Sequence, residues 1–231
     1  MNSGKSTMLL TLLRLLELQS GTIELDGVDI SQVRLDLLRR QCFVTVSQDT
    51  LLLSNETLRF NLDPDGNLQD NIIIDALVRT GLWHKFAENG IGKKYVGYGT
   101  VDNADSGKHP VLDEKVSELQ ELSVGQAQLF GICRALIKVT ALRSAGVMPV
   151  VLLDEITSSL DPATESTIFS VVEEEFSGRG HTVISIAHRL GDLVKHTKSG
   201  RDVVVVLRDG RLQEVITDLT QLGVEDLEED E

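Results

Sequence analysis

The sequence predicts an α/β fold, with a doubly wound, mostly parallel β-sheet into which a helical subdomain is inserted. The short apolar segments Val150–Leu153 and Thr182–Ile186 lack polar alternation, as is typical of parallel strands that are covered on both faces. A helical pattern over Pro162–Phe176 separates them, with Asp161 at the capping position and Pro162 at the first helical position. Strand, helix and strand in this order indicate parallel pairing through a crossover helix.

The N-terminal part follows the same logic. The apolar run Met8–Leu16 predicts a mostly buried helix packed on the sheet. Gly21–Ile30 alternates and turns at Asp26-Gly27, which predicts a strand-turn-strand unit. A short helix is expected over Arg34–Arg40, and the β-rich segment Cys42–Ser47 predicts a buried strand.

The chain is expected to form one partial domain. Its core would comprise residues 1–56 and 147–217, its helical subdomain residues 57–146, and its acidic tail residues 222–231. The polar, glycine-rich stretch Gly90–His109 is long for a loop in a compact domain, which predicts a mobile insertion. The run of four valines within Asp202–Leu207 predicts another strand of the parallel sheet.

Composition narrows the function classes. The 231 residues carry a net charge of −14, and six acidic but no basic side chains fall among the last ten residues. This balance argues against nucleic acid as a partner, because binding its backbone needs a basic face. The sequence contains no run of 18 apolar residues that would predict a membrane span. The two cysteines fit neither a disulfide framework nor a metal site.

The first seven residues carry the strongest chemical signal. They match the second half of a phosphate-binding loop, G-x-x-x-x-G-K-[ST], whose opening glycine is absent from the sequence. In such a loop, backbone N–H groups and a helix N-terminus surround a phosphate. Lys5 would reach the β- and γ-phosphates, and the Ser6 hydroxyl could ligate Mg²⁺. The candidate nucleotide-binding residues here are Asn2, Ser3, Gly4, Lys5, Ser6 and Thr7. Taken alone, the half-motif could also be a chance Gly-Lys-Ser-Thr before a helix.

A second signal lies at the end of an apolar strand. Val150–Leu153 is followed by Asp154 and Glu155. Such a strand delivers its carboxylates to the carboxyl edge of the sheet, where ligands bind in open α/β folds. Asp154 would hold Mg²⁺, and Glu155 would act as the general base that accepts a proton from the attacking water. The alternative is a strand that happens to end in acids.

A third signal is Leu-Ser-Val-Gly-Gln at 122–126, at the start of a helix. Ser123, Gly125, Gln126 and the helix dipole would form a second anion site. Between a phosphate loop and an apolar strand that ends in Asp-Glu, this segment resembles the signature of ATP-binding-cassette (ABC) ATPases. The resemblance implies a P-loop NTPase-type fold. It also implies that the signature closes over ATP held by a second nucleotide-binding domain, in a head-to-tail sandwich.

Three further segments resemble motifs of that family. Val46–Asp49 resembles the Q-loop, in which Gln48 would sense Mg²⁺ as a ligand and take part in catalysis. Ser158–Asp161 resembles the D-loop, in which Asp161 would reach across the dimer. Ile186–Leu190 resembles the switch region, in which His188 would contact the γ-phosphate and hold the attacking water.

The resemblance covers residues 1 to about 215. It is closest to the second, C-terminal nucleotide-binding domain of the multidrug-resistance-associated (C) subfamily, on the basis of Leu51–Pro64, Val124 and Glu155. It implies binding and hydrolysis of ATP with Mg²⁺, transmembrane domains of a transporter as partners, and a place at the cytosolic face of a membrane.

Departures from the family pattern keep alternatives open. The strands that precede the phosphate loop in the family, and the aromatic residue that stacks on adenine, are missing from the sequence. Ala127 also stands where the family often has a basic residue. The first alternative is therefore a truncated, catalytically incompetent fragment, or an incomplete gene model, of such a transporter. The second is a soluble ABC protein of translation or DNA repair, although those usually carry paired cassettes or coiled coils.

Overall fold

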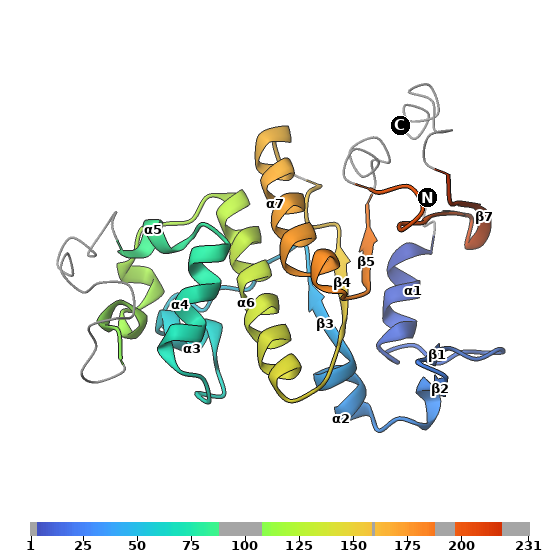
Figure 1. The fold of residues 1–231 in the computed structure, drawn as a ribbon, viewed down its shortest axis with the longest axis horizontal. Coiled ribbons are helices and arrows are strands. Elements are labelled where there is room, and N and C mark those ends of the chain that lie inside the picture. The colour runs from blue at the N-terminus through green and yellow to red at the C-terminus, as the bar shows by residue number, and fades with distance from the viewer. Residues whose placement is uncertain (1–3, 88–107, 159, 188–196, 219–231) are drawn as a thin grey trace.

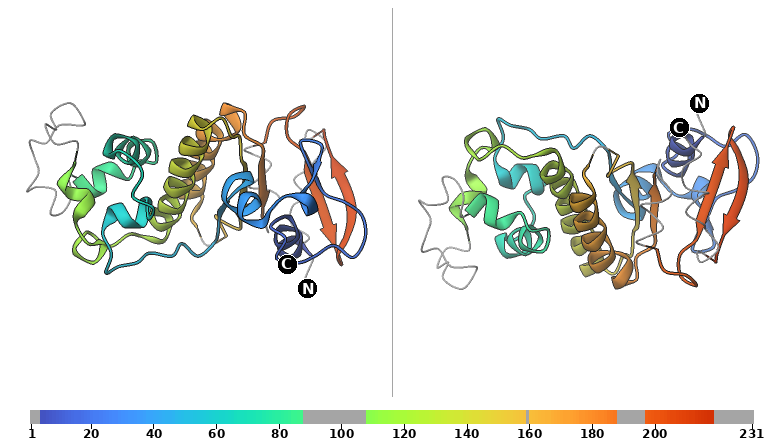
Figure 2. Two further views of the ribbon diagram at one scale, coloured as in Figure 1. Left: turned by 90° about the horizontal axis from the view of Figure 1, so that it is seen from below. Right: turned by 90° about the horizontal axis from the view of Figure 1, so that it is seen from above.

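The computed structural model describes residues 4–87, 108–158, 160–187 and 197–218. The fold has three parts along its longest axis (Figure 1). A group of helices lies at one end, a three-stranded sheet with its covering helices lies in the middle, and two short hairpins lie at the other end. Views from below and above give the same order (Figure 2).

The central sheet is parallel, as predicted. Its strand order is β3 (Phe43–Val46), β4 (Val150–Asp154) and β5 (Val183–Ile186). Phe43 pairs with Val150, and Val151 pairs with Val183. The strand predictions over these three segments are confirmed to within one residue at each end.

Helices cover both faces of this sheet, which confirms the doubly wound architecture. Alternate strand residues point to opposite faces. One face, with Val44, Val46, Val151 and Leu153, belongs to a large core shared with the helices on that side. The other face packs against Leu9 of α1 (Lys5–Leu12) in a smaller cluster.

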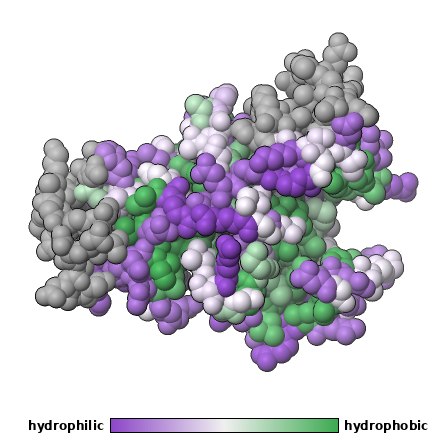
Figure 3. Space-filling model, in the orientation of Figure 1, coloured by the Kyte–Doolittle hydropathy of each residue, from purple (hydrophilic) through white to green (hydrophobic). Residues whose placement is uncertain are grey.

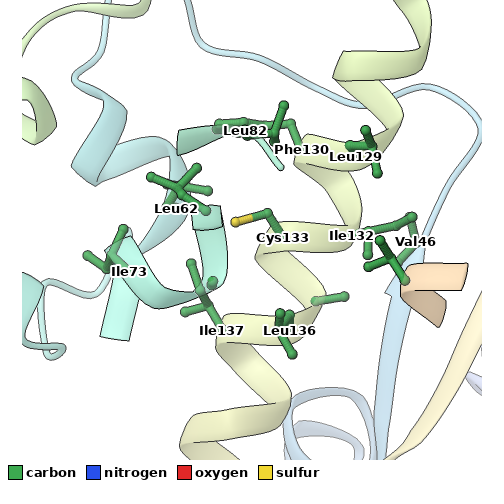
Figure 4. Packing of buried hydrophobic residues seen from close by; sticks show 14 of the residues in the cluster. Val46, Leu62, Ile73, Leu82, Leu129, Phe130, Ile132, Cys133, Leu136 and Ile137 are labelled. Atoms are coloured by element: carbon green, nitrogen blue, oxygen red, sulfur yellow. The ribbon is translucent and has the colours of Figure 1, made fainter. Parts of the chain in front are cut away.

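The large core is built around α6 (Val124–Ser144), the longest helix that the structure describes. Figure 4 shows Ile132 of α6 beside Val46 of β3, whereas Cys133 points toward Leu62 on the opposite side. α6 therefore joins the sheet to the helical group. The rest of this group consists of short elements: α3 (Leu58–Leu62), α4 (Asp70–Arg79), α5 (Trp83–Ala87), η4 (Pro110–Asp113) and η5 (Val116–Glu118).

The predicted helix over Pro162–Phe176 is confirmed as α7 (Pro162–Glu175), followed by η6 (Ser177–Arg179). The helix predicted over Arg34–Arg40 is a short α2 (Leu35–Leu37) that continues as a π-helical turn, η2 (Leu38–Cys42). A 3₁₀ turn, η1 (Ile30–Gln32), precedes it.

The predicted strand-turn-strand unit is confirmed as β1 (Glu24–Leu25) and β2 (Val28–Asp29). Asp26 and Gly27 both have positive φ, 50° and 78°. This is the conformation that the tightest hairpin turns require, and Asp-Gly is among the pairs that adopt it most readily.

Two predictions about burial and pairing were wrong. The first is the strand expected over Asp202–Leu207. It is β6 (Val204–Arg208), and it pairs antiparallel with β7 (Arg211–Ile216), outside the parallel sheet. The two-residue turn at Asp209-Gly210 folds the chain straight back, so a neighbouring strand covers one edge while Val205 stays half exposed.

The second concerns the first helix, which is shorter and less buried than expected. α1 ends at Leu12, and only Leu9 is buried, while Met8 and Leu10 are 37% and 39% exposed. Within the described residues α1 packs on the sheet along one side only. Figure 3 shows apolar surface around α1, beside the hollow that opens between the two hairpins.

The predicted insertion Gly90–His109 and the acidic tail lie almost wholly or entirely outside the described residues. No helix in the described parts of the chain is long and apolar enough to cross a bilayer. The division into a core and a helical subdomain stays a prediction.

Candidate functional site

The candidate site lies at the edge of the sheet where all three parallel strands end. β3 is followed by Gln48, β4 ends in Asp154 with Glu155 next, and β5 is followed by Ala187. The N-terminal ends of α1, α6 and α7 lie on the same side of the molecule, the upper side in Figure 1. The edge therefore combines acidic side chains with helix N-termini, whose partial positive charge favours anions.

The phosphate-loop residues reach this edge through α1. Gly4 is the N-cap of α1 and has a φ of +91°, which a glycine adopts without strain. Lys5 Nζ donates to the carbonyl oxygen of Ala187 at 3.1 Å, so the lysine lies at the end of β5. Ser6 and Thr7 are exposed in the first turn of α1. The carbonyl that accepts from the Lys5 ammonium is neutral, so this contact does not neutralise the charge of the lysine.

The turn of the β6–β7 hairpin also approaches the phosphate loop. A Cβ placed on Gly4 would lie 3.3 Å from Gly210 Cα. This close approach was not predicted, although the Asp209-Gly210 pair was visible in the sequence. The start of α1 thus lies between the end of β5 and this turn.

Asp154 and Glu155 lie side by side where β4 ends. Burial, and then the neighbouring Glu155 carboxylate, raise the pKa of Asp154 above its usual value. Glu155 has a φ of +51°, and its N–H donates to the Ile186 carbonyl at 3.1 Å. Two adjacent carboxyl groups, one of them disfavoured as an anion by burial, suit a cation or a proton-transfer role.

The donor set can be tested for Mg²⁺. Within the described residues no group of three or more His, Cys, Asp or Glu side chains could hold a metal by itself. Mg²⁺ commonly uses only one or two carboxylates together with substrate phosphates and water. Asp154, supplemented by the Ser6 hydroxyl and the Gln48 amide, fits that requirement in chemical type.

Gln48 is held by two neighbours. Its side-chain Nε2 donates to Ser158 Oγ at 3.0 Å, and its backbone carbonyl accepts from Nε2 of Gln128 on α6. The two predicted segments around Gln48 and Ser158 are thus in direct contact. Ser158 lies three residues beyond Glu155, so this bond ties Gln48 to the loop after β4.

The second predicted anion site is a well-formed helix start. Ser123 Oγ accepts from Gln126 N, and Gln126 Oε1 accepts from Ser123 N, which together make a capping box. The start of α6 lies against α7, since a Cβ on Gly125 would come within 2.3 Å of Thr164 Cγ2. Asp161 caps α7 by accepting from Ala163 N and Thr164 N, both at 3.1 Å.

The predicted residues thus form two groups. Lys5, Gln48, Asp154 and Glu155 converge on the end of the sheet, together with Gly4 and Ser6 at the start of α1. Ser123, Gly125, Gln126 and Asp161 gather where α6 and α7 begin. Asn2, Ser3 and His188 lie outside the described residues. Sequence reasoning missed Gln128, because an amide in a helix gives no local signal of a contact 80 residues away.

A parallel α/β sheet with a phosphate loop, an acidic strand end and a capped signature helix defines the class as a P-loop nucleotide-binding domain. A family profile described as "ABC transporter" matches residues 2–158. An ABC-type transporter of Gibberella zeae is 38% identical over 92% of this chain. The oligomycin resistance ATP-dependent permease YOR1 of Saccharomyces cerevisiae is 36% identical over 97% of it.

Among solved structures, a bacterial Atm1-family ABC exporter with ATP bound matches with a TM-score of 0.68 and 29% identity. That match covers 94% of this chain and 32% of the exporter chain. The chain belongs to the ABC transporter family. Its relatives include ABC transporter C family member 9 of Arabidopsis thaliana, at 36% identity over 92% of this chain. The chain spans 12% of the length of that relative and of the Gibberella protein, and 14% of YOR1.

Proposed function

We propose that this chain binds and hydrolyses ATP as the nucleotide-binding domain of an ABC transporter, and that hydrolysis powers export across a membrane. The observation that carries the proposal is the convergence of Lys5 on the sheet edge that presents Gln48, Asp154 and Glu155. The relative described as an ATP-dependent permease and the solved ABC exporter support the transport role.

Each group at the edge has a part in this mechanism. The backbone of Gly4 and the Lys5 ammonium would hold the phosphates, with Asn2, Ser3, Ser6 and Thr7 completing the loop. Asp154, Ser6 and Gln48 would hold Mg²⁺, which neutralises charge that develops on the phosphates. Glu155 would take the proton of the attacking water. His188 would contact the γ-phosphate.

The signature residues are assigned to a second nucleotide-binding domain. Ser123, Gly125, Gln126 and Asp161 cluster beside α7, and α1 with Lys5 lies across the sheet from them (Figure 1). An anion site that is separate from the chain's own phosphate loop fits closure over ATP held by a partner, in a head-to-tail sandwich. The other partners would be transmembrane domains, with this chain at the cytosolic face and no nucleic acid involved.

Binding is tested by thermal unfolding of the chain with and without Mg·ATP. A ligand at a hundred times its Kd stabilises by about 2.7 kcal/mol, which corresponds to a rise of roughly 5–11 °C in Tm for a chain of this size. Lys5→Ala should abolish the rise, whereas Lys115→Ala, at an exposed lysine of the helical group, should keep it. An equal rise in both variants would refute the assignment of the phosphate site. No rise in the wild type would favour the catalytically incompetent alternative.

Catalysis is tested by Glu155→Gln. Removing a general base typically lowers turnover by about 10²–10⁴-fold, while nucleotide binding should persist because the phosphate contacts remain. Glu118→Gln, at an exposed glutamate of the helical group, provides the matched control. Wild-type turnover in Glu155→Gln would exclude Glu155 as the base.

A further inference from the structure

The segment that follows β3, from Gln48 to Leu51, is fastened along one face of α6. Gln128 Nε2 donates to the Gln48 carbonyl. Three residues on, Gly131 leaves no room for a side chain, because a Cβ there would lie 2.9 Å from Thr50 Oγ1. After three more residues, the Arg134 guanidinium donates to the Leu51 carbonyl. Positions three apart share a helix face, so these contacts form one continuous seam.

Gln128 is the member of this seam that acts on the site. It is buried, with 6% of its surface exposed. Only its Nε2 can donate to a carbonyl, which fixes the orientation of the amide. Its Oε1 is buried without a hydrogen-bond partner in the part of the chain that the structure describes.

The unpaired oxygen argues that Gln128 does more than stabilise the fold. Burying an unpaired polar atom opposes folding, so an apolar residue of similar size would suit the position better for stability alone. What the amide provides is the bond to the Gln48 backbone. The side chain of the same residue, Gln48, donates to Ser158.

We propose that Gln128 is a positioning residue: by holding the Gln48 carbonyl, it sets the direction in which the Gln48 side chain leaves the end of β3. The role of Gln48 rests on the proposed function, whereas the fixing of the segment does not. Because Gln128 lies in the second turn of α6, whose first turn carries the signature, a shift of the helix start would move Gln48. The seam thus couples the partner-facing anion site to the chain's own nucleotide site.

The first test needs no nucleotide. Hydrogen exchange of the segment from 47 to 53 is compared between the wild type, Gln128→Met and Cys133→Ala. Methionine keeps the length and helix propensity but cannot donate. Cys133 is fully buried on α6 but points away from β3 (Figure 4), so its variant controls for a general loosening of the helix.

We expect several-fold faster exchange of this segment in Gln128→Met and no comparable change in Cys133→Ala. Cooperative unfolding of each variant checks that it is folded, and Gln128→Leu is a second variant that lacks the donor. Unchanged exchange in the folded Gln128 variants, or the same increase in Cys133→Ala, would overturn the proposal.

The second test distinguishes positioning from stability. Gln128→Met should lower ATP turnover about tenfold, the factor that corresponds to roughly 1.4 kcal/mol and to one lost hydrogen bond. In a Gln48→Ala background the same substitution should cost nothing more, because no side chain is left to position. An equal loss in both backgrounds would overturn the positioning role. A wild-type chain that neither binds nor hydrolyses ATP would refute the proposed function, while hydrogen exchange still decides whether Gln128 fixes the segment.

Discussion

A substitution at Gly125 tests how closely α6 packs against α7. It is the second residue of α6, and an alanine there would place its Cβ 2.3 Å from Thr164 Cγ2. Thr164 cannot turn aside freely, because its hydroxyl donates to Asp161 Oδ2 at 2.7 Å and β-branched side chains are stiff at χ1. The glycine therefore lets α6 and α7 approach where both helices begin.

Two opposing effects decide the sign of Gly125→Ala. Gly125 does not have a positive φ, so alanine by itself would stabilise the helix by up to about 1 kcal/mol. Forcing a methyl group into a filled site costs typically 1–3 kcal/mol. We expect the clash to win, with a net loss of about 1–2 kcal/mol.

The assay is urea unfolding of the wild type, Gly125→Ala, Thr164→Ser and the double variant. Thr164→Ser removes the clashing methyl group and keeps the hydroxyl, and the next nearest Thr164 atom would be 3.5 Å from the new Cβ. In the Thr164→Ser background, adding Gly125→Ala should therefore cost much less stability than it does in the wild type. A Gly125→Ala chain that is more stable than the wild type, or a double variant without recovery, would refute this account of the packing.

Three further predictions concern stability. Glu175→Gln should lower the free energy of unfolding in urea by about 3–5 kcal/mol, because this buried carboxylate pairs with two arginines, one from α4 and one from η6. The control Glu174→Gln, at an exposed glutamate, should change it by no more than about 0.5 kcal/mol. Hydrogen bonds from Arg201 and Lys198 lower the pKa of Glu173 to about 2 from its ordinary 4.5, so its stabilisation is present above pH 4.5 and lost as the pH falls toward 2. Glu173→Gln should reduce the loss in free energy of unfolding between pH 5 and pH 3. A loss as large as that of the wild type would contradict this role of Glu173. Ser123→Ala should cost about 1 kcal/mol by removing the cap of α6, whereas Ser144→Ala at its other end should cost less, and equal losses would exclude the capping role.

Local signals in the sequence predicted much of the fold. The three parallel strands follow from unbroken apolar runs, the start of α7 from Asp161-Pro162, and the first hairpin from Asp26-Gly27. Each of these depends on residues within a few positions, so no tertiary information was needed. The same turn rule would have found β7, since Asp209-Gly210 repeats the pair.

The errors share a physical cause. A run of valines shows that a strand is apolar but not which strand it pairs with, so β6 was assigned to the wrong sheet. An apolar helix pattern shows which residues prefer burial but not how many neighbours are present to bury them, as the exposed Met8 and Leu10 illustrate.

The positions of three candidate site residues were predictable for a different reason. Strand ends fix Gln48, Asp154 and Glu155 at one edge, because parallel strands share direction. The bond that brings Lys5 to Ala187 and the bond from Gln128 to Gln48 join residues that are 182 and 80 positions apart. Contacts at such separations leave no local pattern in a single sequence.

The register of the sheet has a consequence for the order of folding. Phe43 pairs with Val150, so the chain must close a loop of more than a hundred residues before β3 can pair with β4. The entropic cost of closing this loop is smaller if α3, α4 and α6 have already collapsed into one cluster, because the two ends of the helical segment then start near each other. We therefore expect the helices between β3 and β4 to become protected early in refolding. The pairing of β3 with β4, which completes the edge where the nucleotide would bind, should follow in the late, slow phase.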